Sequence, residues 1–397
     1  MTHKARILKT IRGEKTDRVP FIPRLDIWYN ANKKSGTLPE KYKNASLIEI
    51  TDDLGLGYHS VVPAFRDFIN EDEGATDIGL GVYRFRALPY AVKFHEIKRK
   101  TNFESGGVTV TEYITPRGTL TTRVRYDERM KSDGATLSVI LEHAVKGPRD
   151  YDAAAFIFEN AEITPDYDYY KFYADEIVGE RGVAVACAAI YASPMHFLLK
   201  ELMPIENFFV ELHENPDELK GLARGIKGYC DKIFTAASGC PADIILSGAN
   251  YDSAITTPPF FREFIAPELT RQSKILREKG KFLATHADGE NDGLLEMIKD
   301  CGVDLADSIC PAPMTRKTLS DVMEVFGGAV TVWGGIPSVC MLKDSMNDYE
   351  FDEFLNLTME CAANGGVILG IADTVPPGAD FGRIIKIDET AKKYGVF

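Results

Sequence analysis

The second half of the chain alternates between short, continuously apolar runs and longer segments in which apolar residues recur every three or four positions. The apolar runs occupy residues 182–190, 242–250, 281–286, 303–309, 329–336 and 366–371. The intervening segments, such as 216–237 and 348–364, have the period of amphipathic helices. Buried strands that alternate with helices indicate parallel pairing with right-handed crossovers. We therefore predict an α/β fold, a (β/α)8 TIM barrel that residues 1–397 form as a single domain; an open doubly wound sheet is the alternative.

Residues 78–135 break this rhythm. Four runs alternate apolar and polar side chains, and Gly-Gly and Pro-Arg-Gly turns separate the later ones; they occupy 82–86, 90–97, 107–114 and 118–126. This pattern is typical of antiparallel hairpins. We expect a β insertion within the barrel domain.

Composition narrows the class of protein. The chain is 45% hydrophobic and 26% charged, with a formal net charge of -13, which argues against nucleic acid or an anionic membrane as the main partner. No apolar run approaches the ~18 residues that span a bilayer, and the first residues lack the apolar core of a signal peptide. Seven scattered cysteines without a CxxC motif suggest reduced thiols. We expect a cytoplasmic protein with a small-molecule pocket.

Candidate chemistry lies where the predicted strands end. In Thr285-His-Ala-Asp-Gly-Glu290, an extended chain would project His286, Asp288 and Glu290 to one side. Active sites of barrels lie at the carboxyl ends of the strands. That rule gathers around one mouth the residues Arg24, Asn250, Asp252, His286, Asp288, Cys310, Trp333 and Asp373. An imidazole with carboxylates suits a zinc ion acting as a Lewis acid; the alternative is a hydrogen-bonded ring of polar side chains.

Several motifs follow one another from residue 6 to residue 370. They are Arg6-Ile-Leu-Lys-Thr-Ile-Arg-Gly-Glu-Lys-Thr-Asp-Arg-Val-Pro20, Val145-Lys-Gly-Pro-Arg-Asp-Tyr151, Thr257-Pro-Pro-Phe-Phe-Arg-Glu-Phe-Ile-Ala-Pro267, Thr285-His-Ala-Asp-Gly289, Gly334-Gly-Ile-Pro337 and Gly366-Val-Ile-Leu-Gly370. In this order they resemble the uroporphyrinogen decarboxylase superfamily, which also contains corrinoid-dependent methyltransferases. The resemblance implies an enzyme with a (β/α)8 barrel and an active site in its mouth.

The site residues favour the methyltransferase branch. The decarboxylases carry an arginine-rich segment after the first strand and Gly-His-Gly after the last, whereas this chain has only Arg24 and Ala372-Asp373-Thr374. Zinc methyltransferases of the superfamily bind metal through His-x-Cys and a later cysteine, positions that match His286, Asp288 and Asp373 here. Carboxylates in place of thiolates leave a harder Lewis acid, which suits an oxygen leaving group. The resemblance therefore implies O-demethylation of a methoxylated, aromatic compound in anaerobic metabolism.

This resemblance also implies residue roles. His286, Asp288 and Asp373 would hold Zn²⁺, with Glu290 as a fourth ligand or orienter, and the corrinoid would sit on a separate corrinoid-binding protein. The remaining residues would contact substrate: Asn250, Asp252 and Tyr191 at the leaving oxygen, and Arg24, Trp28, Tyr29, Tyr251 and Trp333 around the rest. Two alternatives stay open: a cofactor-free decarboxylase of a porphyrinogen-like or smaller carboxylated substrate anchored by Arg24, and a barrel that only binds a ligand. The sequence leaves open the identity of the methyl donor and whether the chain forms a homodimer.

Overall fold

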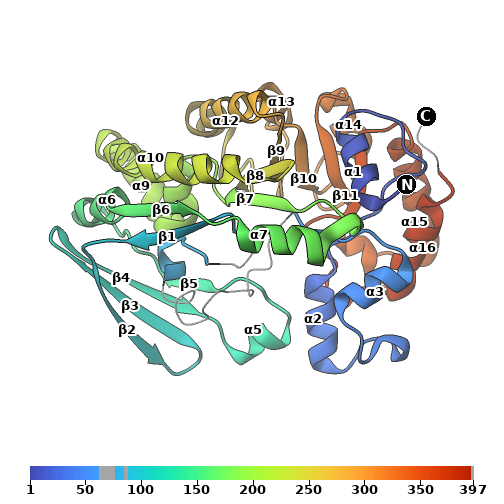
Figure 1. The fold of residues 1–397 in the computed structure, drawn as a ribbon, viewed down its shortest axis with the longest axis horizontal. Helices are drawn as coiled ribbons and strands as arrows, with labels where there is room; N and C mark the ends of the chain where they lie inside the picture. The colour runs from blue at the N-terminus through green and yellow to red at the C-terminus, as the bar shows by residue number, and fades with distance from the viewer. Residues whose placement is uncertain (62–76, 85–87, 395–397) are drawn as a thin grey trace.

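The structure is a computed structural model that describes residues 1–61, 77–84 and 88–394. Its centre is a parallel sheet of six strands that lie in sequence order (Figure 1). The strands are β7 (Val185–Ala189), β8 (Ile244–Ala249), β9 (Phe282–His286), β10 (Leu305–Ile309), β11 (Thr331–Ile336) and β12 (Val367–Ile371). All six predicted apolar runs form these strands, which confirms a mixed α/β chain of successive strand–helix units.

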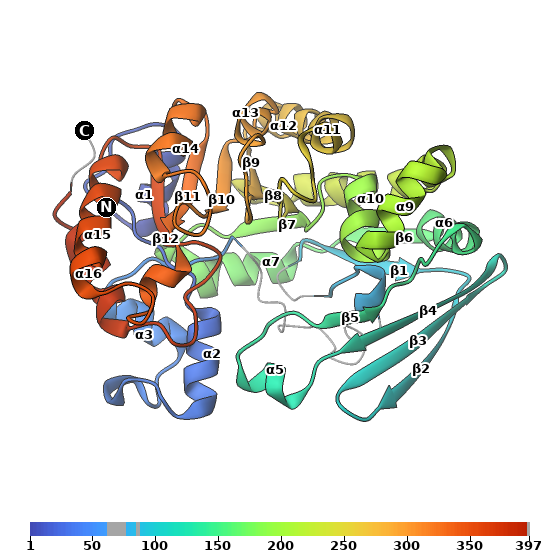
Figure 2. The same ribbon diagram turned by 180° about the vertical axis from the view of Figure 1, so that it is seen from behind.

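Helices connect the strands and cover the outer face of the sheet (Figure 2). The main ones are α6 (Tyr151–Glu159), α9 (Ile205–Glu214), α10 (Pro216–Gly239), α12 (Ala266–Glu278), α13 (Leu295–Asp300), α14 (Leu319–Phe326), α15 (Asp348–Ala362) and α16 (Phe381–Ala391). Outward strand residues such as Ile245, Leu283 and Val332 pack with these helices in one large core. Of the helices described, none is both long and apolar enough to cross a membrane.

A second core fills the inner side of the same strands. Cys187, Leu246, Ala284, Leu305 and Trp333 belong to this inner cluster, and each is buried. Because successive strand residues point to opposite faces, these positions alternate with those that meet the helices. Burial on both faces explains why the strands are continuously apolar in sequence.

Two short segments extend the sheet at its edges. Phe21 forms a parallel bridge with Leu369 of β12, and at the other edge the Tyr58 N–H donates to the Arg181 carbonyl before β7 at 2.8 Å. The edges approach closely, since a Cβ atom at Gly57 would lie 2.7 Å from the Ile22 side chain. Within the described ranges, however, no backbone hydrogen bond joins 20–22 to 57–60. Closure into an eight-stranded barrel therefore stays a prediction.

Residues 18–24, which lead to Arg24, pair with the sheet only through that single bridge among the described residues. Pro20 and Pro23 have no N–H to donate to a ladder, which limits pairing in this segment. A helix, α2 (Asp26–Ser35), begins directly afterwards.

The insertion forms a four-stranded antiparallel sheet beside the main sheet (Figures 1 and 2). Its strands are β2 (Lys98–Glu104), β3 (Val108–Thr115), β4 (Gly118–Arg125) and β5 (Val139–Glu142). The hairpin prediction is thus confirmed, although the sheet runs beyond residue 135. The run at 90–97 contributes β1 (Tyr90–Phe94), which pairs instead with β6 (Ala161–Pro165). In the predicted run 82–86, residues 82–84 are not a strand and the rest lie outside the described residues.

A buried carboxylate joins the insertion to the rest of the protein. Asp77 is 1% exposed and precedes the short helix η2 (Ile78–Leu80). Its Oδ1 accepts from Arg99 Nε of β2 at 2.9 Å and its Oδ2 from an Arg84 guanidinium nitrogen at 3.0 Å. Two guanidinium groups therefore compensate one buried charge.

Replacing Asp77 with alanine should lower the free energy of unfolding by about 3–5 kcal/mol, because two cations lose their buried partner. Chemical denaturation followed by circular dichroism measures this. The control is Glu112→Ala at the exposed Lys100–Glu112 pair, 3.5 Å apart on the same sheet, which should cost at most about 1 kcal/mol. Equal effects of the two substitutions would contradict the assignment.

Candidate active site

His286 ends β9 and pairs with a carboxylate on the neighbouring strand. The register of β9 and β10 sets His286 opposite Asp307, and His286 Nδ1 lies 2.6 Å from Asp307 Oδ2. Both side chains are buried. Because the carboxylate only accepts, Nδ1 carries the proton and Nε2 is left to face the site. We call these two residues the histidine–aspartate pair.

A second histidine contacts the same carboxylate from the edge of the sheet. His59 Nε2 lies 3.5 Å from Asp307 Oδ1, and the His59 ring meets Trp333 edge-on at 5.4 Å. The Trp333 indole in turn donates to the Ile22 carbonyl at 3.2 Å. Burial raises the pKa of Asp307, but hydrogen bonds from His286 and His59 outweigh it and hold that pKa well below its ordinary value. Asp307 is therefore a charged carboxylate in the inner core.

Asp373 follows β12 and brings a second carboxylate to the imidazole. Its Oδ1 lies 3.6 Å from His286 Nε2 and accepts from an Arg24 guanidinium nitrogen at 3.0 Å. Arg24 also contacts both oxygens of Asp26. The backbone of Asp373 has φ 54°, a region that few non-glycine residues occupy, and its N–H donates to Ser308 Oγ at 2.6 Å. These contacts hold the carboxylate at the strand end.

The surroundings favour a protonated His286. Burial alone lowers its pKa, but the hydrogen bond and charge of Asp307, with the charges of Asp373 and Asp288, raise the pKa above its ordinary value. The imidazole can therefore hold a proton at Nε2 and give it to a bound group.

Asn250 connects this centre to a lysine. It follows β8 with φ 58°, and its backbone N–H donates to the His286 carbonyl at 2.9 Å. The Asn250 amide lies 3.4 Å from Asp288 Oδ2, while its Oδ1 accepts from Lys200 Nζ at 2.6 Å. Burial raises the pKa of Asp288, and the charge of His286 opposes that rise.

A cavity of about 540 Å³ opens above these groups. One wall comes from the strand ends and the other from the segment that leads into β5. The lining residues are Arg24, Ile27, Tyr83, Ala135, Thr136, Leu137, Ser138, Ile140, His143, Ile190, Lys200, Glu201, Leu246, Ala249, Asn250, His286, Asp288 and Asp373. The insertion therefore builds part of the site.

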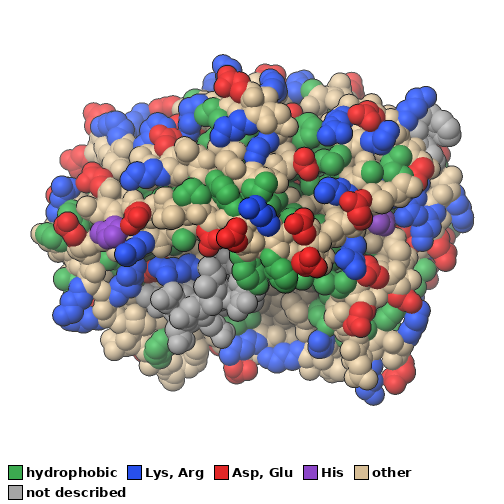
Figure 3. All heavy atoms as spheres, viewed as in Figure 1, with side chains coloured by type: hydrophobic (Ala, Val, Ile, Leu, Met, Phe, Trp, Pro, Cys, Tyr) green, Lys and Arg blue, Asp and Glu red, His purple; other side chains and the backbone are tan. Residues whose placement is uncertain are grey.

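On the outer face drawn in Figure 3, acidic and basic side chains are interspersed.

The three aromatic residues predicted to line a ring pocket lie elsewhere. Trp28 and Tyr29 are buried in α2, where Trp28 stacks on Phe381 at 5.4 Å and the Tyr29 hydroxyl donates to the Ala45 carbonyl. The helix begins at Asp26, and neither ring lines the cavity. Trp333 lies below the cavity in the inner core.

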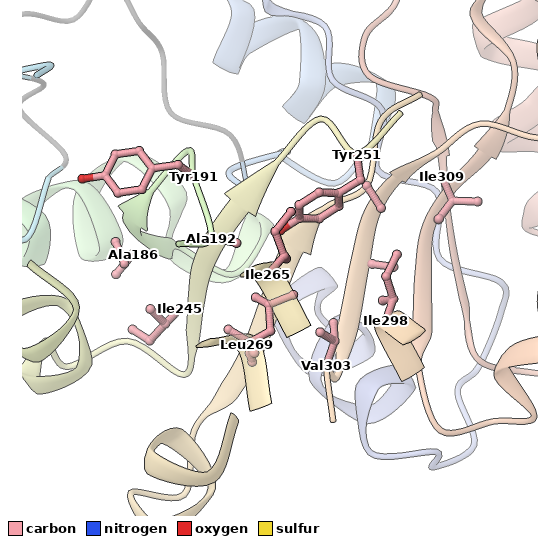
Figure 4. Close-up of a cluster of buried hydrophobic side chains, with 14 of the residues drawn as sticks. Ala186, Tyr191, Ala192, Ile245, Tyr251, Ile265, Leu269, Ile298, Val303 and Ile309 are labelled. Atoms are coloured by element: carbon pink, nitrogen blue, oxygen red, sulfur yellow. The ribbon is translucent and has the colours of Figure 1, made fainter. Parts of the chain in front are cut away.

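Four other predicted residues have partners away from the cavity. The Tyr191 ring stacks on Phe197 at 4.0 Å, and the Tyr251 hydroxyl contacts Thr285 Oγ1 at 2.8 Å. Figure 4 shows both tyrosines within the hydrophobic cluster. Asp252 accepts from the N–H groups of Ala254 and Glu290, and the Glu290 carboxylate accepts from those of Asp292 and Arg316. Asp252 and Glu290 thus stabilise turns.

The predicted ligands are residue types that bind zinc, but their side chains do not converge on one point. In the described part of the chain, no three His, Cys, Asp or Glu side chains form a group that could hold a metal ion. Asp288 contacts Asn250, and Arg24 occupies Asp373 Oδ1. Cys310 adds no thiolate, since burial raises its pKa to about 12. His286 and Asp373 alone face each other.

Asp307, His59 and Lys200 were not predicted. Asp307 lies inside an apolar run, and only the strand register reveals its partner. The other two stand in segments without a motif.

Comparison with known proteins agrees with this architecture. Neither a family model nor a curated protein matches the chain. Among solved structures, a methyltransferase from Methanosarcina mazei matches 99% of this chain and 98% of its own, with a TM-score of 0.51 and 14% sequence identity. At this identity the match shows a shared fold over the full length.

Asp307→Asn should lower the pKa of His286, because the charge that favours the imidazolium is removed while a hydrogen-bonding side chain of similar size remains. NMR titration of labelled histidines measures this, with the His286 signal assigned by its loss in His286→Gln. The control is Asp304→Asn, where Oδ2 accepts from the Leu283 N–H at the opposite end of the strands. An unchanged His286 pKa in Asp307→Asn would refute the pairing.

Proposed function

We propose that this chain is a methyltransferase that takes the methyl group of a methoxylated aromatic compound and passes it to the cobalt of a separate corrinoid protein. Full-length similarity to a solved protein named as a methyltransferase supports methyl transfer. The sequence resemblance to corrinoid-dependent relatives supports the acceptor. We also propose that segments 20–22 and 57–60 join the six parallel strands and complete a (β/α)8 barrel.

The histidine–aspartate pair at the base of the cavity carries this proposal. When the bond between methyl carbon and oxygen breaks, the oxygen departs with the bonding electrons and needs a proton. His286 holds that proton at Nε2, and Asp307 keeps the ring oriented and stabilises its charge. Proton donation by a positioned histidine typically contributes ~10²–10⁴-fold to a rate.

The cavity suits a small aromatic substrate. Its volume of about 540 Å³ is within the ordinary range for small-molecule sites. Ile27, Leu137, Ile140, Ile190 and Leu246 supply apolar wall. These aliphatic side chains take the role that Trp28, Tyr29 and Trp333 were predicted to have.

Zinc remains a prediction, with His286, Asp288 and Asp373 as ligands. When bound, it would act as a Lewis acid on the leaving oxygen. Its binding requires Asp288 to leave Asn250 and Asp373 to share its oxygen with Arg24. In that case His286 gives Nε2 to the metal, so the metal content distinguishes the two ways of stabilising the oxygen.

Among the described residues, no contact favours the decarboxylase alternative. Its proposed anchor, Arg24, already pairs with Asp26 and Asp373. The guanidinium group is therefore engaged by two carboxylates of this chain.

The reaction is tested by incubating the purified chain with methoxylated benzoates and reduced cobalamin under anoxic conditions. Methyl transfer changes the visible absorption of the corrinoid. His286→Ala should lower kcat/KM by about 10²–10⁴-fold, whereas His95→Ala, at an exposed pair with Glu162 on the insertion, should leave it unchanged. Transfer that persists in His286→Ala would exclude the proposed role of this residue.

Metal analysis of the purified protein tests the zinc prediction. We expect about one zinc ion per chain, lost in His286→Ala and reduced in Asp288→Ala and Asp373→Ala, because each removes one ligand. The His95→Ala variant should retain the metal. Folded, active protein without metal would show that the zinc prediction is wrong and leave proton donation by His286.

A further inference from the structure

We propose that Lys200 binds a carboxylate of the substrate, so that the enzyme acts on methoxylated acids. This inference rests on the proposed function, in which the methoxy group at the other end of the substrate loses its methyl group. Lys200 lies in the π-helix η6 (Leu198–Leu202). It lines both the active-site cavity and a neighbouring cavity of about 640 Å³.

Among the described residues, the Lys200 ammonium has only neutral hydrogen-bond partners. Its Nζ donates to Asn250 Oδ1 at 2.6 Å and faces the Ala249 carbonyl at 3.4 Å. In the described portion of the chain, no carboxylate oxygen lies within 4.0 Å of it. By contrast, Lys146, which lines the neighbouring cavity, pairs with Glu142 at 3.0 Å. An ammonium has three N–H donors, so Lys200 can still bind an acceptor in the cavity.

Lys200 is also partly shielded from water. Its side chain is half-buried, and burial lowers its pKa while the charges of Glu201 and Asp288 raise it. Removing a cation from water without a counter-ion is unfavourable. An anionic group bound from the cavity would compensate this charge directly.

The position of Lys200 sets the geometry of the substrate. Asn250 contacts Lys200 through its side chain and the His286 carbonyl through its backbone. A carboxylate at Lys200 therefore lies across the same cavity from the histidine–aspartate pair. The two cavities share Ile140, His143, Lys200 and Asn250 as lining, so the bound acid group would lie at their junction.

Arg24, the other cation of the active-site cavity besides His286, is less suited to this role. Its guanidinium already contacts Asp26 and Asp373. A new anion there would have to compete with both. No carboxylate of the described residues competes in this way by direct contact with Lys200.

The test is calorimetric binding of a matched pair, 3-methoxybenzoate and 3-methoxybenzamide, to the full chain without corrinoid. We expect the acid to bind about tenfold tighter or more, the usual effect of one charge-assisted hydrogen bond. Lys200→Met, which keeps most of the side-chain volume, should abolish this preference. Lys200→Arg should restore most of it, and Lys146→Met should leave it unchanged. Circular dichroism verifies that each variant is folded.

Several results would overturn the proposal. These are an absence of acid preference in the unchanged protein, no binding of either compound, a preference that survives Lys200→Met, or an equal loss of both ligands. Covalent trapping of an aldehyde on Lys200 by borohydride would assign the amine to imine chemistry instead. The binding test is independent of methyl transfer. A Lys200-dependent preference for the acid without methyl transfer would contradict the proposed function alone. Methyl transfer without that preference would contradict only the carboxylate site at Lys200.

Discussion

One buried charge determines the geometry of the site. Asp307 lies on the inner face of β10, two residues from Leu305 and in register with Trp333. A carboxylate in such surroundings costs several kcal/mol unless close hydrogen bonds compensate it. His286 and His59 supply those contacts from β9 and from the sheet edge. Three segments that are distant in sequence are therefore held in one arrangement, and the free nitrogen of His286 is oriented as a consequence.

The same principle applies on the opposite wall of the cavity. Burial raises the pKa of Glu201, and the charge of Lys200 and the hydrogen bond from Tyr83 lower it. Tyr83 directly precedes Arg84, which with Arg99 contacts Asp77 and so anchors the insertion. Asp77, Asp307 and Glu201 each contact a side chain from another part of the chain. The cavity thus depends on the docking of the insertion as well as on the sheet.

Sequence patterns identified the strands whose two faces are both buried in apolar surroundings. The run 242–250 became β8 because both of its faces are buried, and strand ends led correctly to His286, Asp288, Asn250 and Asp373 as cavity residues. Trp28 and Tyr29, which were expected to contact the substrate, are instead buried in α2, which begins at Asp26. Trp28 stacks on Phe381 of α16. Pro20 and Pro23 limit strand pairing in the preceding segment.

The missed residues depend on long-range contacts. Asp307 is one polar residue in an apolar run, and its role follows only from being opposite His286 in the neighbouring strand. His59 lies in a segment without a clear period. Lys200 stands between Leu199 and Glu201 in a π-helical turn, where the direction of a side chain departs from ordinary helical spacing. None of these positions is distinguishable by residue type alone.

The balance of charge then decides between a proton and a metal at His286. Three cationic side chains of the cavity, Arg24, Lys200 and His286, face three carboxylates, Glu201, Asp288 and Asp373. A metal ion binds only the unprotonated Nε2, so the contacts that raise the pKa of His286 oppose metal binding more strongly as the pH falls. Asp307 also makes the imidazole a better ligand once the proton has left. The affinity for the proposed metal should therefore rise with pH, and the described lining residues carry equal numbers of carboxylates and cationic side chains, which leaves room for an anionic substrate.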